Sequence, residues 1–139
     1  MAGNNAPIYS KVGNVQWASG AITAANTTID LTSGTSYLVF TADATNGGYL
    51  PRIRFRSLGT NVATVARVWI TNATGPGVGA NAILWDEITL PATTVSQTGA
   101  LTVQELPLGF ALDPGYKIYV TLGTAVAAGY HATIPGGKY

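Results

Sequence analysis

The chain has 139 residues, and charged residues make up only 9% of it, with a formal net charge of +1. This balance argues against a general nucleic-acid binder, whose affinity comes from many Lys and Arg contacts to phosphate. The absence of cysteine excludes a disulfide framework and a thiolate metal site. The length is typical of one domain, and the 47% hydrophobic content is enough for a core.

The first residues lack a basic region followed by an apolar run, and no stretch of about 18 consecutive apolar residues occurs. We therefore expect no recognisable signal peptide, no membrane-spanning segment and no membrane partner. The low charge leaves an exterior of Thr, Ser, Asn, Gly and Ala. Such an exterior suits a protein that packs against partners, and it is also common in stable all-β proteins.

Residues 1–14 contain Gly and Asn and show weak periodicity, which predicts an extended N-terminal arm rather than part of a core. Residues 15–139 are predicted to form one β-sandwich domain, because short segments rich in β-branched and aromatic residues alternate there with Gly- and Pro-containing turns. The predicted strands are Asn14–Trp17, Thr27–Leu31, Tyr37–Ala42, Tyr49–Leu58, Ala63–Asn72, Ala82–Leu90, Thr102–Leu112, Tyr116–Leu122 and Gly129–Ile134. No segment predicts a helix.

The stretch RIRFRSL places Arg52, Arg54 and Arg56 on alternate residues, with Ile53 and Phe55 between them. On a strand the three arginines would line one face while the two apolar side chains enter the core. This row can bind phosphate, pair with acids or meet a neighbouring subunit. We favour ion pairs across strands or subunits, because the planar guanidinium group binds a carboxylate through two hydrogen bonds. Direct DNA binding is the alternative.

The acids available to this row are Asp86, Glu87 and Glu105. Asp86 and Glu87 are adjacent, so on a strand they point to opposite faces and cannot act as one carboxylate pair or begin a calcium cage. His131 is the only histidine, and neither a nucleophile elbow nor a zinc motif accompanies it. We therefore expect no catalytic site, no metal and no cofactor.

The alternation in TVARVWITN places Arg67 and Trp69 on one strand face. Large rings on strands fill a core or a subunit interface, which is the interpretation we favour for the aromatic residues. Alternatively they form a platform that stacks against sugar rings, and Trp69 is then the best candidate because it shares a face with Arg67.

Three runs of the sequence resemble small structural proteins of tailed-bacteriophage virions, of the jelly-roll head decoration, or cement, type. These runs are RIRFRSLGTNVATVARVWITN, LWDEITLPATTVSQTGAL and ELPLGFALDPGYKIYVTLGTAVAAGYHATIPGGKY. The resemblance implies an all-β, jelly-roll-like antiparallel sandwich and a non-enzymatic homotrimer. It also implies that the trimer binds the major capsid protein on the virion surface after assembly in the host cytoplasm.

With this resemblance we expect a subunit or capsid interface and a capsid-binding arm. The interface would include Arg52, Arg54, Arg56, Arg67 and Trp69, and the arm Asn4, Asn5, Pro7, Ile8 and Tyr9. No nucleic-acid partner is expected. The alternative function is that of a tail-associated or receptor-binding module that recognises a host-surface glycan.

Overall fold

The computed structural model describes residues 12–139, and the arm residues predicted to bind a capsid, Asn4 to Tyr9, lie outside this range. The described chain forms eight strands and one short 3-10 turn. They are β1 (Val12–Trp17), β2 (Tyr37–Thr41), β3 (Gly48–Ser57), β4 (Thr64–Thr71), the turn η1 (Gly79–Asn81), β5 (Ala82–Leu90), β6 (Val103–Leu112), β7 (Lys117–Leu122) and β8 (Tyr130–Lys138). Within residues 12–139, no helix is long and apolar enough to cross a membrane.

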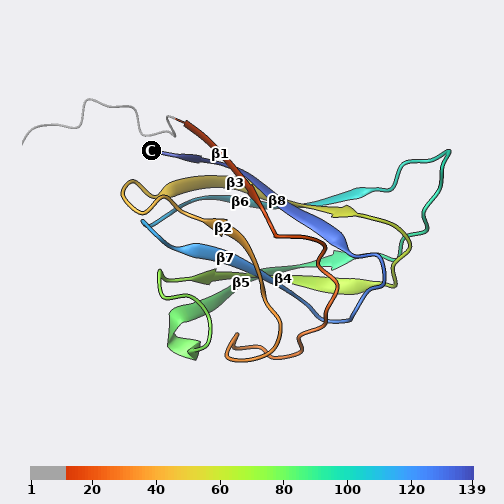
Figure 1. The fold of residues 1–139 in the computed structure, drawn as a ribbon, viewed down its shortest axis with the longest axis horizontal. Helices are drawn as coiled ribbons and strands as arrows, with labels where there is room; N and C mark the ends of the chain where they lie inside the picture. The colour runs from red at the N-terminus through yellow and green to blue at the C-terminus, as the bar shows by residue number, and fades with distance from the viewer. Residues whose placement is uncertain (1–11) are drawn as a thin grey trace, which may run out of the picture.

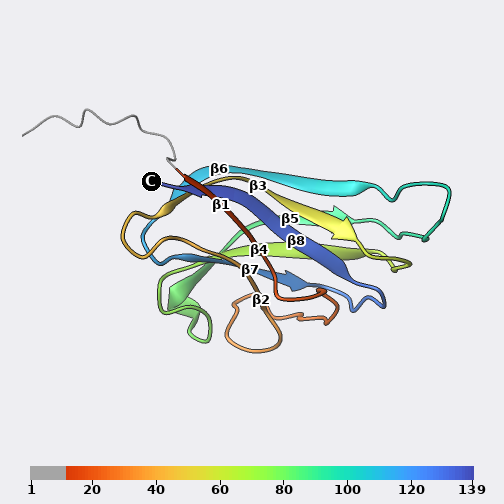
Figure 2. The same ribbon diagram turned by 45° about the horizontal axis from the view of Figure 1, so that its top comes forward.

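The strands form two antiparallel sheets of four, ordered β1-β8-β3-β6 and β2-β7-β4-β5. The pairs β4 with β5, β3 with β6, β2 with β7 and β1 with β8 are nested around the β4–β5 connection. A long antiparallel hairpin that is wound into two packed sheets has this order, which is that of a jelly roll. The predicted all-β sandwich is confirmed, and Figures 1 and 2 show the two sheets stacked on each other.

The core lies between the two sheets and follows the alternation of side chains along each strand. Ile53 and Phe55 of β3 are completely buried, and so are Val68 of β4 and Ile118 and Val120 of β7. Burial of one such side chain stabilises the fold by about 1.5–3 kcal/mol. The core therefore holds the sheets together and fixes which side chains of each strand face outward.

The strand predicted over Thr27–Leu31 is wrong, because this segment forms a bent loop. The buried Asn26 amide organises the loop: its Nδ2 donates to the carbonyl oxygens of Ser33 and Thr35, at 3.0 and 3.1 Å. Its Oδ1 accepts the backbone N–H of Thr28 at 3.0 Å. An Asn side chain that bonds its own loop in this way competes with pairing in a sheet, and this competition explains the error.

The first and last strands are both longer than predicted. Val12 to Asn14, which we assigned to the arm, belong to β1 and pair with the end of β8, from Lys138 back to Gly136. The Gly-rich end of β8 shows no apolar alternation, so its sequence does not read as a strand. A Cβ at Gly136 would lie 2.8 Å from Phe40 of β2, so glycine allows the two sheets to approach closely there.

A second buried amide, Asn61, joins three connections at one end of the sandwich. Its Nδ2 donates to Ser57 Oγ at 3.0 Å and to the Gly129 carbonyl at 3.1 Å. Its Oδ1 accepts the N–H groups of Ala128 and Gly129, both at 2.9 Å. The backbone of Asn61 also pairs with Thr93. One side chain thus satisfies four hydrogen-bonding groups of the protein.

We predict that Asn61→Ala lowers the free energy of unfolding by about 3 kcal/mol, because it leaves buried partners without hydrogen bonds. Urea denaturation measures this loss. Asn46→Ala is the control, since Asn46 is exposed and its backbone N–H, which bonds to Asp43, is kept in the variant. Equal stability of the two variants would contradict the central role of Asn61.

Candidate functional site

The predicted arginine row lies on the outer face of the β1-β8-β3-β6 sheet. Arg52, Arg54 and Arg56 of β3 are exposed, whereas Ile53 and Phe55 between them are completely buried. The alternation predicted from RIRFRSL is therefore confirmed. The row crosses the middle of the sheet, because β3 lies between β8 and β6.

Two arginines of the row share one carboxylate of the neighbouring strand. Glu105 Oε1 of β6 lies 3.6 Å from Arg52 Nε and 3.9 Å from Arg54 Nε, and Glu105 is the register partner of Arg54. Arg56 instead donates from Nη1 to the Leu101 carbonyl at 3.2 Å. The side chains of Arg52, Arg54 and Glu105 are about half exposed, so each ion pair contributes about 0–1 kcal/mol. The row is thus partly neutralised within the chain and remains open to solvent.

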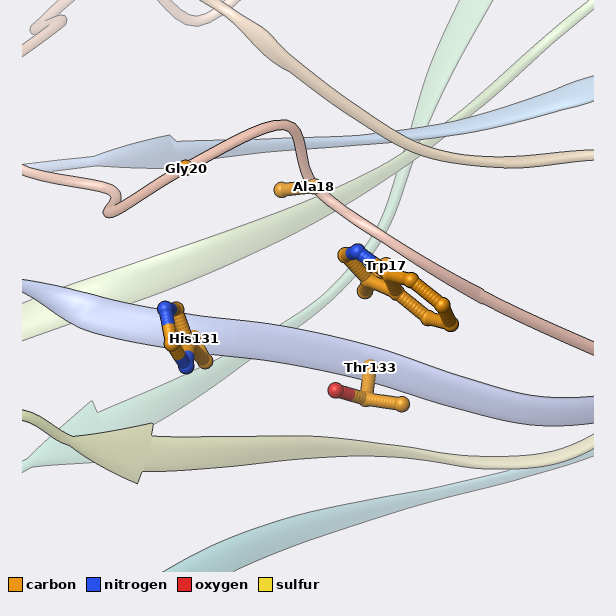
Figure 3. Close-up of a pocket in the computed structure, with 5 residues that line it drawn as sticks. All are labelled: Trp17, Ala18, Gly20, His131 and Thr133. Carbon is orange, nitrogen blue, oxygen red and sulfur yellow. The ribbon is translucent and has the colours of Figure 1, made fainter.

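Beside the row, a shallow cavity of about 350 Å³ lies between β1 and β8. It is lined by Trp17, Ala18, Gly20, His131 and Thr133. Figure 3 shows the Trp17 ring beside Thr133, with the His131 imidazole farther along β8. Trp17 is 66% exposed.

The strand register connects this cavity to the arginine row. Thr133 pairs with Trp17 on one side and with Arg54 on the other, and His131 pairs with Arg56. A line across the sheet therefore runs from the ring of Trp17 through the hydroxyl of Thr133 to the guanidinium of Arg54. Our sequence reasoning included Trp17 among the rings of a possible sugar-stacking platform, with Trp69 as the best candidate, and did not mention Thr133. The alternation of Val15 and Trp17 with polar neighbours indicates an apolar face turned to a core, so no local signal shows that the Trp17 ring faces outward.

Arg67 and Trp69 lie together on the other sheet, but they are not a surface site. Trp69 is only 2% exposed, and its Nε1 donates to Thr121 Oγ1 of β7 at 3.0 Å. The prediction of Trp69 as an interface residue or sugar-stacking ring is therefore wrong for the described chain. The Arg67 side chain is 16% exposed, and its Nε lies 3.8 Å from Glu87 Oε1. Its Nε and Nη1 are inaccessible and lack hydrogen-bond partners within residues 12–139.

Two connections between strands cover this outer face. Figures 1 and 2 show the 25–36 and 72–81 segments on the side of the β2-β7-β4-β5 sheet that faces away from the other sheet. The Gly77 N–H donates to the Leu31 carbonyl at 3.2 Å, which joins the two connections. Lys117 Nζ of β7 donates to the Ala73 carbonyl at 2.8 Å. The coverage explains why a strand position opposite to the core is buried at Trp69.

An aromatic pair lies where the two sheets share an open edge, formed by β5 and β6. The ring centroids of Trp85 and Phe110 are 4.7 Å apart, and their planes are tilted by 59°. Trp85 is 45% exposed and Ile83, on the same strand, is 58% exposed. The ladder between β4 and β5 shifts register at Trp85, as in a β-bulge. This edge was not predicted as a site.

The remaining polar candidates do not converge on one another. The Asp86 carboxylate accepts the N–H of Glu87 at 2.8 Å, on β5 of one sheet, whereas His131 lies on the outer face of the other sheet. In the range 12–139, no three His, Asp or Glu side chains gather as metal ligands would. What the structure brings together on the outer face of the β1-β8-β3-β6 sheet is a row of cations, the exposed Trp17 ring and hydroxyl groups.

Comparison of the sequence with known protein families found no match. Comparison with curated proteins also found none.

We predict that the two partners of the Arg67 ion pair respond differently to substitution. Glu87→Gln should lower the free energy of unfolding by about 1 kcal/mol, because it leaves a largely buried guanidinium without its charge partner. Arg67→Met should be neutral within about 1 kcal/mol, since it also removes two unsatisfied N–H groups.

Urea denaturation tests this asymmetry, with Glu105→Gln as the control at an exposed pair, where the loss should stay under about 0.5 kcal/mol. A larger loss for Arg67→Met than for Glu87→Gln would show that the guanidinium itself stabilises the fold.

Proposed function

We propose that this protein is a non-enzymatic structural component of a tailed-bacteriophage virion, and that it decorates the head. Its trimers would bind across the joins between major capsid subunits. Binding to several subunits at once raises the free energy needed to separate them, because the ligand stabilises only the assembled state. The resemblance of three sequence runs to head decoration proteins and the jelly-roll sandwich support this proposal.

The observation that carries the proposal is the exposed apolar edge in a chain of very low charge. Ile83 is 58% exposed and Trp85 is 45% exposed. The Trp85 ring packs against the ring of Phe110 at the same edge, with the two planes tilted. Exposed apolar clusters of this kind mark sites of protein association. We assign this edge to the contact between the chains of a trimer, and the N-terminal arm to the contact with the capsid.

The alternative of a glycan-recognition module has Trp69 as the best candidate for its stacking ring. That residue is buried and hydrogen-bonded to Thr121, so it offers no ring to a sugar. Decoration therefore remains the function that we propose for the chain.

We predict that the protein is a trimer at micromolar concentration and that Trp85→Lys dissociates it into folded monomers. The lysine places a charge in the apolar contact, where its desolvation is unfavourable. Multi-angle light scattering gives the mass, and circular dichroism checks the fold. Val62→Lys is the matched control, because Val62 is 58% exposed but lies in the connection between β3 and β4. A parent protein that is monomeric at micromolar concentration would contradict the predicted trimer.

We further predict that the protein raises the temperature at which expanded phage heads rupture, and that deletion of residues 2–11 abolishes this effect. The deletion ends before β1, so the sandwich should remain folded. Dye release from DNA-filled heads on heating measures rupture, with the parent chain and the truncated chain compared at equal protein concentration. Protection that persists without residues 2–11 would move the capsid contact to the sandwich, and no protection by the parent chain would overturn decoration.

A further inference from the structure

The outer face of the β1-β8-β3-β6 sheet brings the exposed Trp17 ring close to cations and hydroxyl groups. Trp17 is 66% exposed, although a tryptophan contributes to stability mainly when it is buried. Among the described residues the only close aromatic pair is Trp85 with Phe110, so the Trp17 ring stacks on no other ring there. Its flat apolar surface is available to a ligand that enters the cavity beside it.

The charges around this cavity favour an anion. Arg54 and Arg56 are the register partners of Thr133 and His131, two of the residues that line the cavity. Glu105 is the acid that meets the row, and it already contacts Arg52 and Arg54. Arg56 forms no ion pair with another described residue, so its charge is the one most available to a ligand.

The distances within the sheet set the size of the ligand. Arg56 lies two strands away from Trp17 and two residues farther along, through His131 and Thr133. With about 4.8 Å between strands and about 3.3 Å per residue, the Cα atoms of Trp17 and Arg56 are about 12 Å apart. A ligand that contacts both is longer than one sugar ring. The cavity, at about 350 Å³, is at the lower end of the volumes found for small-molecule sites.

We propose that this face binds an acidic saccharide, a class of ligand that combines flat apolar ring faces, hydroxyl groups and carboxylates. One sugar ring stacks on Trp17, and its hydroxyl groups exchange hydrogen bonds with Thr133 and His131. The carboxylate of a neighbouring sugar accepts hydrogen bonds from Arg56, which its planar donor group allows.

A single-stranded nucleic acid fits this face less well. Such ligands are held by a continuous basic groove and by several aromatic rings on which successive bases stack. This face has two exposed rings, Trp17 and Tyr49, but Tyr49 lies at the opposite end of β3 from Arg56. Two of the three arginines already contact Glu105. The saccharide site is independent of the proposed place in the virion, because the free protein would bind the ligand without a capsid.

Isothermal titration calorimetry of the full chain tests the proposal. The probes are a glucuronate-containing hexasaccharide of hyaluronan, a neutral hexasaccharide of chitin and a hexamer of thymidylate. We expect the hyaluronan fragment to bind at least about tenfold more tightly than the neutral fragment, because only the acidic fragment forms a charged hydrogen bond with Arg56. The thymidylate hexamer should bind more weakly than the hyaluronan fragment.

Four variants locate the site. Trp17→Ala and Arg56→Gln should each weaken binding of the hyaluronan fragment by about tenfold, whereas Trp17→Phe should keep most of the affinity because it keeps a ring. Val62→Ala, which shortens an exposed apolar side chain in the connection between β3 and β4, should leave the affinity unchanged. Thermal unfolding of each variant checks the fold, and if Trp17→Ala does not fold, the Arg56→Gln result decides.

Three outcomes would overturn the proposal. The first is no binding of the hyaluronan fragment, or equal binding of the acidic and neutral fragments. The second is binding that neither Trp17→Ala nor Arg56→Gln weakens, which would place the ligand elsewhere. The third is tighter, Trp17-dependent binding of thymidylate, which would make the face a nucleic-acid site. A protein that fails to protect heads but still binds the acidic fragment would contradict only the decoration role.

Discussion

The pairing of β8 with both β1 and β3 is the interaction on which the rest of the structure depends. It joins the first described strand to the last one and closes the outermost pair of the nested hairpin. Such pairing between distant parts of a chain is slow to form, because the closure entropy of long loops is lost before the contacts are gained. The low charge of the chain limits electrostatic repulsion between the paired strands. Burial of the core offsets the loss of chain entropy.

The same pairing creates the face that we interpret as a binding surface. β8 places His131 and Thr133 between Trp17 of β1 and the arginine row of β3. Side chains from the first and last described strands therefore lie on one surface. The opposite sheet behaves differently. Its outer face is covered by two connections, which turns Trp69 into a buried residue and leaves Arg67 with one distant carboxylate. The outer face of the β1-β8-β3-β6 sheet is thus exposed to solvent, whereas the outer face of the β2-β7-β4-β5 sheet is covered by the chain itself.

The sequence predicted features that depend on local alternation, and it failed where distant segments meet. The arginine row follows from the two-residue period of a strand, and so does the burial of Ile53 and Phe55. The burial of Trp69 depends on the folding of the 25–36 and 72–81 connections over the sheet, which the two-residue alternation of β4 does not contain. The cavity beside Trp17 was missed for a related reason, because the register that brings His131 near β1 is set by tertiary pairing.

A density map of phage heads incubated with this chain would test the proposed decoration role most directly. We predict trimers on the head at the joins between capsid subunits, with Trp85 of each chain inside the trimer. We also predict that the outer face of the β1-β8-β3-β6 sheet points to solvent, with Trp17 and Arg56 uncovered. Heads without density for the chain, or a head position with this face packed on the capsid, would contradict these proposals.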